Sequence, residues 1–381
     1  MANGNGSTPA LVSQRPSMAT IRLGALTHNL AAIRRQVGGR PIMAIIKANA
    51  YGHGLVPVAR HLAALEVEQL GVAFLEEGIL LRQAGLTLPI LVLGGILDTQ
   101  IGLFLDYDLE ITVSSLAKLR QVEEAAAGRG KTAVVHLKVD TGMERIGVHS
   151  YSAGPFVEAA VRCRQVVVKG IYSHLACADD PSSPMTAEQT ERFAEVVSLF
   201  DKLGAPTPIR HLANSGAILH APDTYFDMVR PGILLYGIYP DPASRRVLAV
   251  RPAMSLSSRV VFFKVVLPHR PISYGATWQT DHPIRVVTVP VGYGDGFRRS
   301  LSSCGQVLIR GRRYPIVGRV CMDQFMVNVE WDEVYNGDEV VLIGSQGEEA
   351  ITVEEMAVAA GTIPYEILTG FNGRVPRIYV Q

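Results

Sequence analysis

A lysine directly after an apolar run is the first feature of the sequence that could do chemistry. Lys47 follows Ile45 and Ile46, and the chain continues as Ala-Asn-Ala-Tyr-Gly-His-Gly. Partial burial at such a place disfavours an ammonium ion and favours a neutral amine, which is the form that makes a Schiff base. The alternatives are a lysine that extends to solvent from the barrel mouth, and a plain strand-to-helix turn formed by Tyr51 and the flanking glycines.

Polar residues also follow several later apolar runs. If these runs are parallel strands of a barrel, their ends meet at one rim, where barrel enzymes carry their catalytic groups. Strand ends are polar in many proteins, so chance supplies part of the pattern. The residues are Asp140 and Arg145, His174, Asn214 and Ser215, and Arg230.

The segments around Ser215 and Gly232 have the composition of a phosphate site. A hydroxyl at a helix start often only caps the helix, but the free backbone N–H groups at the same place bind phosphate. The run Arg230-Pro231-Gly232-Ile233 adds further N–H groups. Because phosphate sites after the last two strands recur in barrels, we favour binding over capping.

Alternation of apolar, β-branched runs with helical periodicity predicts an α/β fold. We expect a helix over Ile21–Val37 and a (β/α)8 barrel over residues 18–246. A doubly wound open sheet is the alternative, although no G-x-G-x-x-G follows the first run. The expected strands are Ile42–Ile46, Gly71–Phe74, Ile90–Leu93, Glu110–Val113, Val134–Val139, Val166–Tyr172, Ile209–Leu212 and Phe226–Val229.

Short strands separated by Gly, Pro and Asp predict a mostly-β domain over residues 247–381. The Pro-rich stretch Tyr239–Pro252 is the expected hinge, and residues 1–17 have the composition of a disordered tail. The expected strands are Arg259–Leu267, Arg285–Val291, Gln306–Ile309, Arg313–Val320, Phe325–Val329 and Glu339–Ile343, with one helix over Val353–Ala360.

Composition excludes several classes of function. Among 381 residues, 36 Lys and Arg balance 35 Asp and Glu, so the chain has no basic surface for nucleic acid or an anionic membrane. No apolar run approaches the roughly 18 residues of a membrane helix. Four cysteines without a C-x-x-C pair indicate free thiols in a reducing cytoplasm.

Two tyrosines lie between glycines or small residues in the C-terminal part, and either could be an ordinary turn residue. Tyr274 is in Ser-Tyr-Gly-Ala-Thr-Trp and Tyr293 is in Gly-Tyr-Gly-Asp-Gly. A tyrosine acting as a base needs help from its surroundings, because its unperturbed pKa is about 10.

Taken together, the motifs resemble those of the alanine racemase family. The similarity begins with the lysine segment AIIKANAYGHG and extends in the family's order over residues 18–380. Further matching segments are LKVDTGMERIGV, GIYSHLA, LANSGA, VRPGILLYG, SYGATW, VGYGDG, GRVCMDQFMV and GTIPYEILTGFNGRVPR.

The resemblance implies pyridoxal 5'-phosphate as cofactor and a two-base mechanism. Lys47 would hold the cofactor covalently and act on the D-antipode of alanine, and Tyr274 would act on the L-antipode from the opposite face. The cofactor would take up the electrons of the Cα–H bond. The product D-alanine would serve the synthesis of cell-wall peptidoglycan.

The resemblance also assigns supporting roles. Arg230 would contact the pyridine nitrogen, and His174 would link this arginine to Tyr274. Lys138 matches a lysine that is carbamylated in some family members and helps to position Arg145. The expected phosphate-binding residues are Tyr51, Ser215, Gly232, Ile233 and Tyr365, and the expected substrate-binding residues are Arg145 and Met322.

One residue departs from many family members. Glu144 precedes Arg145, and its carboxylate could pair with that arginine and weaken its hold on substrate. Because neighbouring side chains in an extended loop diverge, we expect Glu144 to point to solvent.

The family further implies a head-to-tail homodimer in which Tyr274 and Met322 reach the partner's barrel. The alternatives are a serine-preferring or broader amino-acid racemase, a barrel-type pyridoxal-phosphate decarboxylase, a cofactor-binding protein without activity and a racemase-like domain that has lost activity. A small pocket rejects an added hydroxyl only about 100-fold, but Tyr365 and Met322 resemble the alanine-type choices.

Overall fold

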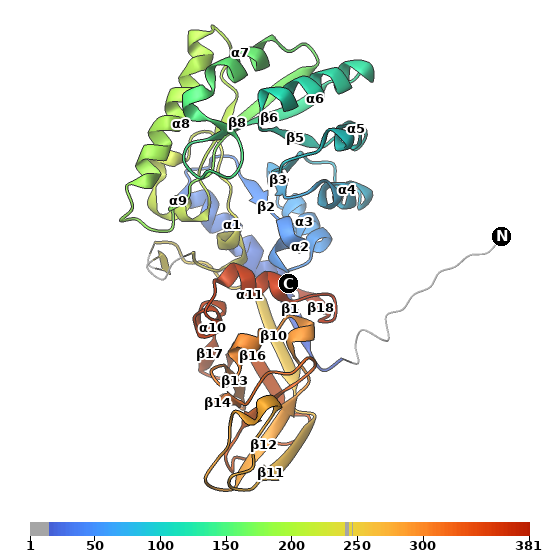
Figure 1. The fold of residues 1–381 in the computed structure, drawn as a ribbon, viewed down its shortest axis with the longest axis vertical. Coiled ribbons are helices and arrows are strands. Elements are labelled where there is room, and N and C mark those ends of the chain that lie inside the picture. Colours follow the sequence, from blue (N-terminus) through green and yellow to red (C-terminus); the bar gives the residue numbers. More distant parts are fainter. Residues whose placement is uncertain (1–14, 241–243, 246) are drawn as a thin grey trace, which may run out of the picture. The chain divides into compact units, whose positions relative to one another are not determined.

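The computed structural model describes residues 15–240, 244–245 and 247–381 and divides the chain into two units (Figure 1). The barrel unit is Ala25–Arg251, and the strand-rich unit joins Met1–Gly24 to Pro252–Gln381. Most of the tail expected at residues 1–17 and part of the expected hinge lie outside the described residues.

Parallel strands form the sheet of the barrel unit. The sheet runs in the order β2-β3-β4-β5-β6-β8-β9, and β7 pairs with β6. Adjacent strands of this series are parallel. Their bounds are β2 (Met43–Ile45), β3 (Gln69–Val72), β4 (Ile90–Val92), β5 (Glu110–Val113), β6 (Ala133–Asp140), β7 (Val148–His149), β8 (Val166–Tyr172) and β9 (Ile209–His211).

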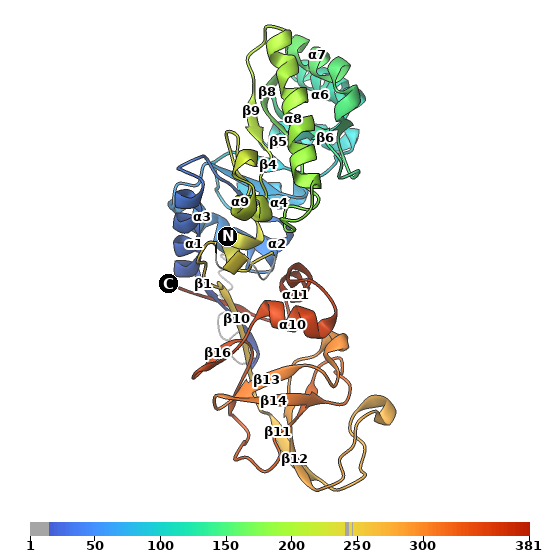
Figure 2. The same ribbon diagram turned by 90° about the vertical axis from the view of Figure 1, so that its left-hand side faces the viewer.

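Helices between these strands cover the outer side of the curved sheet, as two perpendicular views show (Figure 1, Figure 2). Strand-helix-strand connections of parallel strands place the helices outside. The helices are α1 (Leu23–Gln36), α2 (Lys47–Tyr51), α3 (Leu55–Ala64), α4 (Leu75–Gln83), α5 (Ile101–Asp106), α6 (Leu116–Gly128), α7 (Gly154–Arg162), α8 (Met185–Lys202) and α9 (Ser215–His220).

The segment after β9 closes the ring without forming a regular strand. Val229 bridges to Ile42 and Met228 bridges to His211, both in parallel. The expected strand Phe226–Val229 is therefore wrong as a strand, although its residues occupy the expected place. Phe226 has a φ of 46°, which ends extended backbone on that side, and Pro231 has no N–H to continue the pairing.

Polar side chains occupy part of the barrel interior, which is usually filled by branched apolar residues. They come from strands that are not all neighbours in the sheet and are almost completely buried. The residues are Gln69, Glu110, Thr112, His136 and His211.

Mostly antiparallel strands form the strand-rich unit, in the order β11-β12-β15-β14-β13-β16-β10-β1-β18, with β17 beside β16. The strands are β1 (Met18–Arg22), β10 (Met254–Arg259), β11 (Phe262–Val266), β12 (Ile284–Val289), β13 (Gln306–Ile309), β14 (Arg312–Val317), β15 (Phe325–Asn328), β16 (Glu339–Gln346), β17 (Glu349–Ile351) and β18 (Arg377–Val380). The helices are α10 (Val353–Ala360) and α11 (Pro364–Gly370). The predicted fold class, an α/β-barrel followed by a mostly-β domain, is confirmed.

The first strand corrects two expectations from the sequence. Residues 18–22 were expected at the start of the barrel, and Ile21 at the start of a helix. In the structure they form β1, which pairs antiparallel with β10 and parallel with β18. Ala19 and Ile21 are buried in alternation, but the partner strands are more than 200 residues away, so the local pattern did not reveal them.

Among the helices of the residues that the structure describes, none combines the length and the hydropathy that a membrane crossing requires.

Candidate active site

The chain turns with the opposite hand directly after Lys47. Within α2, Ala48, Asn49 and Ala50 have φ values of 53°, 56° and 53°. Left-handed backbone costs an L-residue roughly 1–2 kcal/mol, so surrounding contacts must hold the turn. One of them is the hydrogen bond that the Leu55 N–H donates to the Asn49 side-chain oxygen at 2.8 Å. Backbone held in this way is concentrated at functional sites.

The surroundings of Lys47 favour its neutral form. Burial lowers the pKa of the amine, and the positive charge of Arg145 lowers it further. Glu77 opposes this effect, whereas Arg230 adds to it. The pKa of Lys47 is therefore below the ordinary value for lysine, as its place after an apolar strand led us to expect.

Arg230 is a buried cation held by backbone carbonyl oxygens. The residue is 4% exposed. Its guanidinium donates to Ser173 O at 2.8 Å, to His211 O at 2.5 Å and to Leu212 O at 3.1 Å. Burial lowers the pKa of Arg230 to about 10, so the group still carries its charge at neutral pH.

His174 lies beside this guanidinium as a neutral ring. Arg230 Nη2 is 3.4 Å from His174 Nδ1. Burial lowers the pKa of His174 well below its ordinary value, and the positive charges of Arg230 and Lys138 contribute. Because a guanidinium can only donate, Nδ1 accepts and the proton of the neutral ring is on Nε2.

Hydroxyl and backbone N–H groups converge around Gly232. The Ser215 hydroxyl accepts from Gly232 N–H at 2.9 Å and from Leu234 N–H at 3.3 Å. Ser215 does not cap α9, because Asn214 does so through Ala217 N–H. Among the hydrogen bonds of the described residues, none is donated by Ile233 N–H. These groups can accommodate an anion.

Gly232 leaves room for a tyrosine. A Cβ on Gly232 would lie 2.5 Å from the Tyr51 hydroxyl oxygen, a distance that atoms in contact do not reach. Only glycine therefore allows the Tyr51 hydroxyl to approach this backbone. The Tyr51 ring packs on Tyr236 at a centroid distance of 4.9 Å, which fixes the hydroxyl beside Gly232.

Lys138 is a second buried amine of the barrel. Its Nζ lies 4.5 Å from the centroid of the Tyr172 ring. Burial lowers the pKa of Lys138 well below its ordinary value, and the charge of Arg230 adds to the effect. Burial thus favours the neutral form of the amine, and its carbamylation stays a prediction.

The loop after β6 is folded around the Asp140 carboxylate. The carboxylate accepts from the N–H groups of Gly142, Met143 and Arg145 at 2.8, 2.9 and 3.1 Å. Burial raises the pKa of Asp140, but these N–H groups outweigh it and keep the pKa below its ordinary value. Glu144 is exposed, as expected, and its Oε2 lies 2.8 Å from His149 Nε2.

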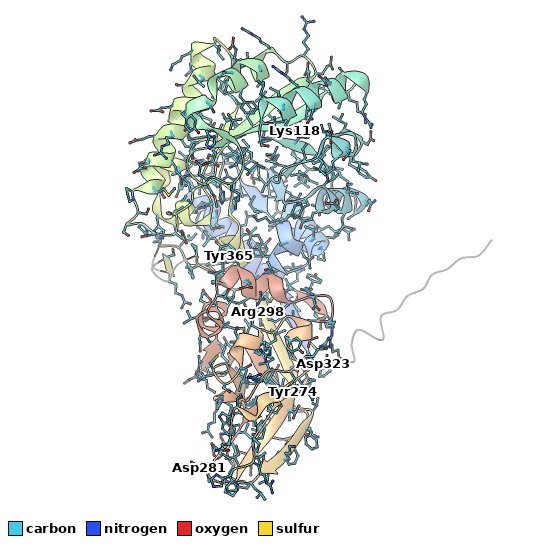
Figure 3. The ribbon with its side chains drawn as sticks, viewed as in Figure 1. Lys118, Tyr274, Asp281, Arg298, Asp323 and Tyr365 are labelled. Atoms are coloured by element: carbon cyan, nitrogen blue, oxygen red, sulfur yellow. The ribbon has the colours of Figure 1, made fainter. Side chains whose placement is uncertain are left out.

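Tyr274 projects from a tight loop of the strand-rich unit (Figure 3). It begins the 3-10 turn Tyr274–Ala276 and is 71% exposed. Ser273 has a φ of 68° and donates its hydroxyl to Arg319 O at 2.6 Å. The loop is therefore held on the segment that precedes Met322.

A buried carboxylate organises the loop that carries Met322. Gly294 N–H donates to Met322 O at 2.8 Å. The neighbouring Asp295 is completely buried. It accepts from Gly292 N–H at 3.0 Å and lies 3.1 Å from Arg374 Nε. Met322 and Tyr274 are thus placed by one set of connected loops.

The predicted site residues divide between the two units. Three of them, Tyr274, Met322 and Tyr365, belong to the strand-rich unit (Figure 3). The residues of the barrel unit lie at or beside the carboxyl ends of the strands and are Lys47, Tyr51, Lys138, Arg145, His174, Ser215, Arg230, Gly232 and Ile233.

Two family models match almost the whole chain. The alanine racemase N-terminal domain matches residues 21–240, and the alanine racemase C-terminal domain matches residues 253–379. The chain belongs to the alanine racemase family.

Individual alanine racemases are similar over their full length. The chain is 42% identical to alanine racemase 2 of Caldanaerobacter subterraneus, covering 96% of this chain and 95% of the relative. It is 44% identical to the alanine racemase of Desulforamulus reducens, covering 96% and 100%. The solved alanine racemase of Streptomyces lavendulae, a D-cycloserine producer, superimposes with a TM-score of 0.93 at 37% identity, covering 96% and 97%.

The alanine racemase family resemblance gave no role to several residues that the structure connects to the site. His211, His136 and Glu110 lie behind Arg230 in the barrel, and Asp295 supports the loop of Met322. A signal was present at Gly170, a glycine within the expected strand Val166–Tyr172. Glycine inside a strand often marks the close approach of another group, which here is the His136 ring.

The lowered pKa of Lys47 predicts how its amine reacts with an acylating reagent. With a lowered pKa, more of the amine is neutral and nucleophilic at pH 8 than in an ordinary lysine. The rate of acetylation of Lys47, followed by peptide mass spectrometry in the cofactor-free chain, should level off at a lower pH than that of a lysine in a short peptide.

A substitution of the neighbouring cation tests the cause. Arg145→Met should raise the pKa of Lys47 and slow its acetylation at pH 8. Arg120→Met, which removes an exposed arginine of α6 that is not among the causes of the shift, is the matched control. Equal rates in both variants would show that Arg145 does not act on the amine.

Proposed function

We propose that this protein interconverts L-alanine and D-alanine with pyridoxal 5'-phosphate as its cofactor. The observation that carries the proposal is the similarity to proteins named alanine racemase, at 42% and 44% identity over 96% of the chain. A solved alanine racemase of Bacillus anthracis with bound L-Ala-P supports it further, with a TM-score of 0.91 at 36% identity.

The residues of the barrel mouth fit this cofactor. Lys47 provides an amine of lowered pKa for covalent attachment. The Ser215 hydroxyl, which Gly232 N–H holds in place, and the N–H group of Ile233 are hydrogen-bond donors that suit a phosphate group. Tyr51 and Tyr365 complete the proposed phosphate site, the latter from the strand-rich unit.

Two bases carry the proposed mechanism. Bound pyridoxal phosphate supplies an electron sink for the charge left when Cα loses its proton. Lys47 Nζ would exchange a proton with Cα on one face, the face that carries the proton in D-alanine. The Tyr274 hydroxyl exchanges a proton on the opposite face, for the L-antipode. Removal on one face and return on the other inverts the configuration.

Arg230 limits the reaction to racemisation in this proposal. It would face the pyridine nitrogen, where its charge and its three carbonyl partners keep it in place. Because its pKa is about 10, it does not give up a proton readily at neutral pH. The ring then attracts electrons less strongly than a protonated ring, which disfavours side reactions such as transamination.

His174 prepares the tyrosine base. Its Nδ1 accepts from Arg230, so the Nε2 proton of the neutral ring is available for the phenolic oxygen of Tyr274. A hydrogen-bond donor to the phenolic oxygen would stabilise the phenolate, the form in which Tyr274 can take a proton.

Arg145 and Met322 form the proposed substrate pocket. Arg145 would pair with the carboxylate of alanine, and Glu144 leaves it free to do so because its carboxylate contacts His149 instead. Met322 would limit the space at the substrate side chain. We infer a preference for alanine over serine from these residues together with Tyr365.

A homodimer with sites shared between copies is part of the proposal. Tyr274 and Met322 are exposed on the strand-rich unit and are available to another barrel. The edge strand β11 and its flank also expose large apolar side chains, with Phe262 53% and Leu267 58% exposed. Exposed apolar edges are commonly covered by a partner chain.

We place the enzyme in the cytoplasm, where it would supply D-alanine for peptidoglycan precursors. All four cysteines are free thiols, in agreement with a reducing compartment.

The first test is the product. The purified protein is incubated with pyridoxal phosphate and an equal mixture of L-alanine and L-serine, and the products are separated by chiral chromatography. We expect D-alanine in large excess over D-serine, and a loss of at least about a thousandfold in Lys47→Ala. D-serine in excess would indicate a racemase that prefers serine. Neither product, with cofactor bound, would favour a decarboxylase or an inactive domain.

The two bases are separated by hydrogen exchange in heavy water. In Tyr274→Phe, Cα–H exchange of L-alanine should fall by at least about a hundredfold, because a positioned base is lost. Exchange of D-alanine through Lys47 should keep at least about a tenth of its rate. Mass spectrometry of each antipode gives both values, and equal losses would contradict the assignment.

Mixing two inactive variants tests the shared site. If Lys47 and Tyr274 come from different copies, dimers of Lys47→Ala with Tyr274→Phe contain one intact site. Random reassortment makes half of the dimers mixed, so about a quarter of the wild-type activity should return. Both single variants treated in the same way are the controls. No recovery, with mixed dimers verified by mass, would place both bases in one chain.

A further inference from the structure

A chain of four hydrogen-bonded side chains begins at Arg230 and crosses the barrel interior. Arg230 Nη1 is 3.2 Å from His211 Nδ1, and His211 Nε2 is 2.8 Å from His136 Nδ1. His136 Nε2 is 2.8 Å from Glu110 Oε2. The chain leads from the carboxyl end of β9, through β6, to the first residue of β5. It therefore connects the mouth of the barrel with its opposite end.

The two ends of the chain determine where its protons are. A guanidinium can only donate and a carboxylate can only accept. His211 Nδ1 must therefore accept from Arg230, so its proton is on Nε2. That proton is donated to His136 Nδ1, and His136 in turn donates from Nε2 to Glu110. Reversal at either ring would place two donors against each other.

Both rings are neutral in this arrangement, as their surroundings require. Burial lowers the pKa of His136, although Glu110 opposes the effect. Burial also lowers the pKa of His211, and the charges of Arg230, Lys138 and Lys169 contribute. Adding a proton to either ring would in addition remove an acceptor from the chain.

The far end of the chain is built to hold a carboxylate. Glu110 Oε1 accepts from Lys169 Nζ at 2.5 Å, and Oε2 accepts from Gln69 Nε2 at 2.5 Å. Gly170 makes room for the chain, because a Cβ at that position would collide with Nδ1 of His136. The Tyr172 ring stacks on His211 at a centroid distance of 4.8 Å. Each member is thus held from the side as well as along the chain.

We propose that Glu110, His136 and His211 are positioning residues that hold Arg230 at one place and in one orientation through a one-way chain of hydrogen bonds. The chain stabilises the buried guanidinium, because a carboxylate and two aligned rings present only acceptors toward it. Its effect on the cofactor rests on the proposed function, in which Arg230 faces the pyridine ring.

The positions of the protons test the chain independently of the cofactor. The full-length protein is prepared with histidine labelled by 15N in the ring, without pyridoxal phosphate, at pH 7.5. His211→Gln and His136→Gln identify the two sets of signals among the ten histidines. We expect both rings to be neutral, with Nε2 protonated and Nδ1 unprotonated. A proton on Nδ1 of His211, or a doubly protonated ring, would overturn the proposal.

The effect on Arg230 is tested through affinity for pyridoxal phosphate. Glu110→Gln combined with Lys169→Met keeps an acceptor for His136, removes the carboxylate charge and gives the new amide space in place of the lysine. Its Kd for the cofactor, measured by absorbance, should rise about tenfold, as when a hydrogen bond to a charged group is weakened. Arg162→Met, which removes an exposed arginine of α7 that takes no part in the chain, is the control and should change Kd less than about twofold.

The outcomes separate the two proposals. If the wild-type chain does not bind pyridoxal phosphate, the proposed function fails while the proton positions still test the chain. If it binds and the double variant binds equally well, the role of the chain in holding Arg230 is refuted. An increase in Kd together with unchanged ring signals of His211 would show that the fold and the chain are intact and that affinity is lost by another route, which would also count against the proposal.

Discussion

The chemistry of the barrel mouth depends on one buried positive charge. Arg230 is removed from water, and no carboxylate of the described residues is in direct contact with it, so carbonyl oxygens and two histidines must replace its hydration. Such a charge is costly unless each N–H finds an acceptor. Its presence then acts on every other group nearby. Burial lowers the pKa of Lys47, of His174 and of Lys138, and the charge of Arg230 adds to the effect in each case.

The consequence is a set of basic side chains whose neutral forms are favoured. A neutral amine at Lys47 can attack a carbonyl carbon, and a neutral ring at His174 can donate from a defined nitrogen. An exposed lysine is charged near neutral pH, and an exposed histidine has no fixed tautomer. A cation thus prepares its neighbours without touching the reacting atoms.

The sequence was sufficient to predict those features that depend on local sequence patterns. Alternating strands and helices predicted the barrel, and an apolar strand before Lys47 predicted a lowered pKa. The sequence did not predict the closing segment, because the backbone at Phe226 is left-handed without a glycine. It also did not predict Asn214 as the cap of α9, since Ser215 was an equally good cap by residue type. The chain behind Arg230 was not found because its members come from distant strands and each has an unremarkable neighbourhood in sequence.

The strand β1 has a consequence for the order in which the molecule is made. It leaves the ribosome before the barrel unit, but its partners β10 and β18 are about 230 and 360 residues later. At roughly 5–20 residues per second, β1 waits on the order of ten seconds or more for β10. During that time the whole barrel unit is synthesised and can fold. The strand-rich sheet, in contrast, is completed only when β18 emerges. Synthesis therefore finishes the proposed cofactor-binding half first and the half that carries Tyr274 last.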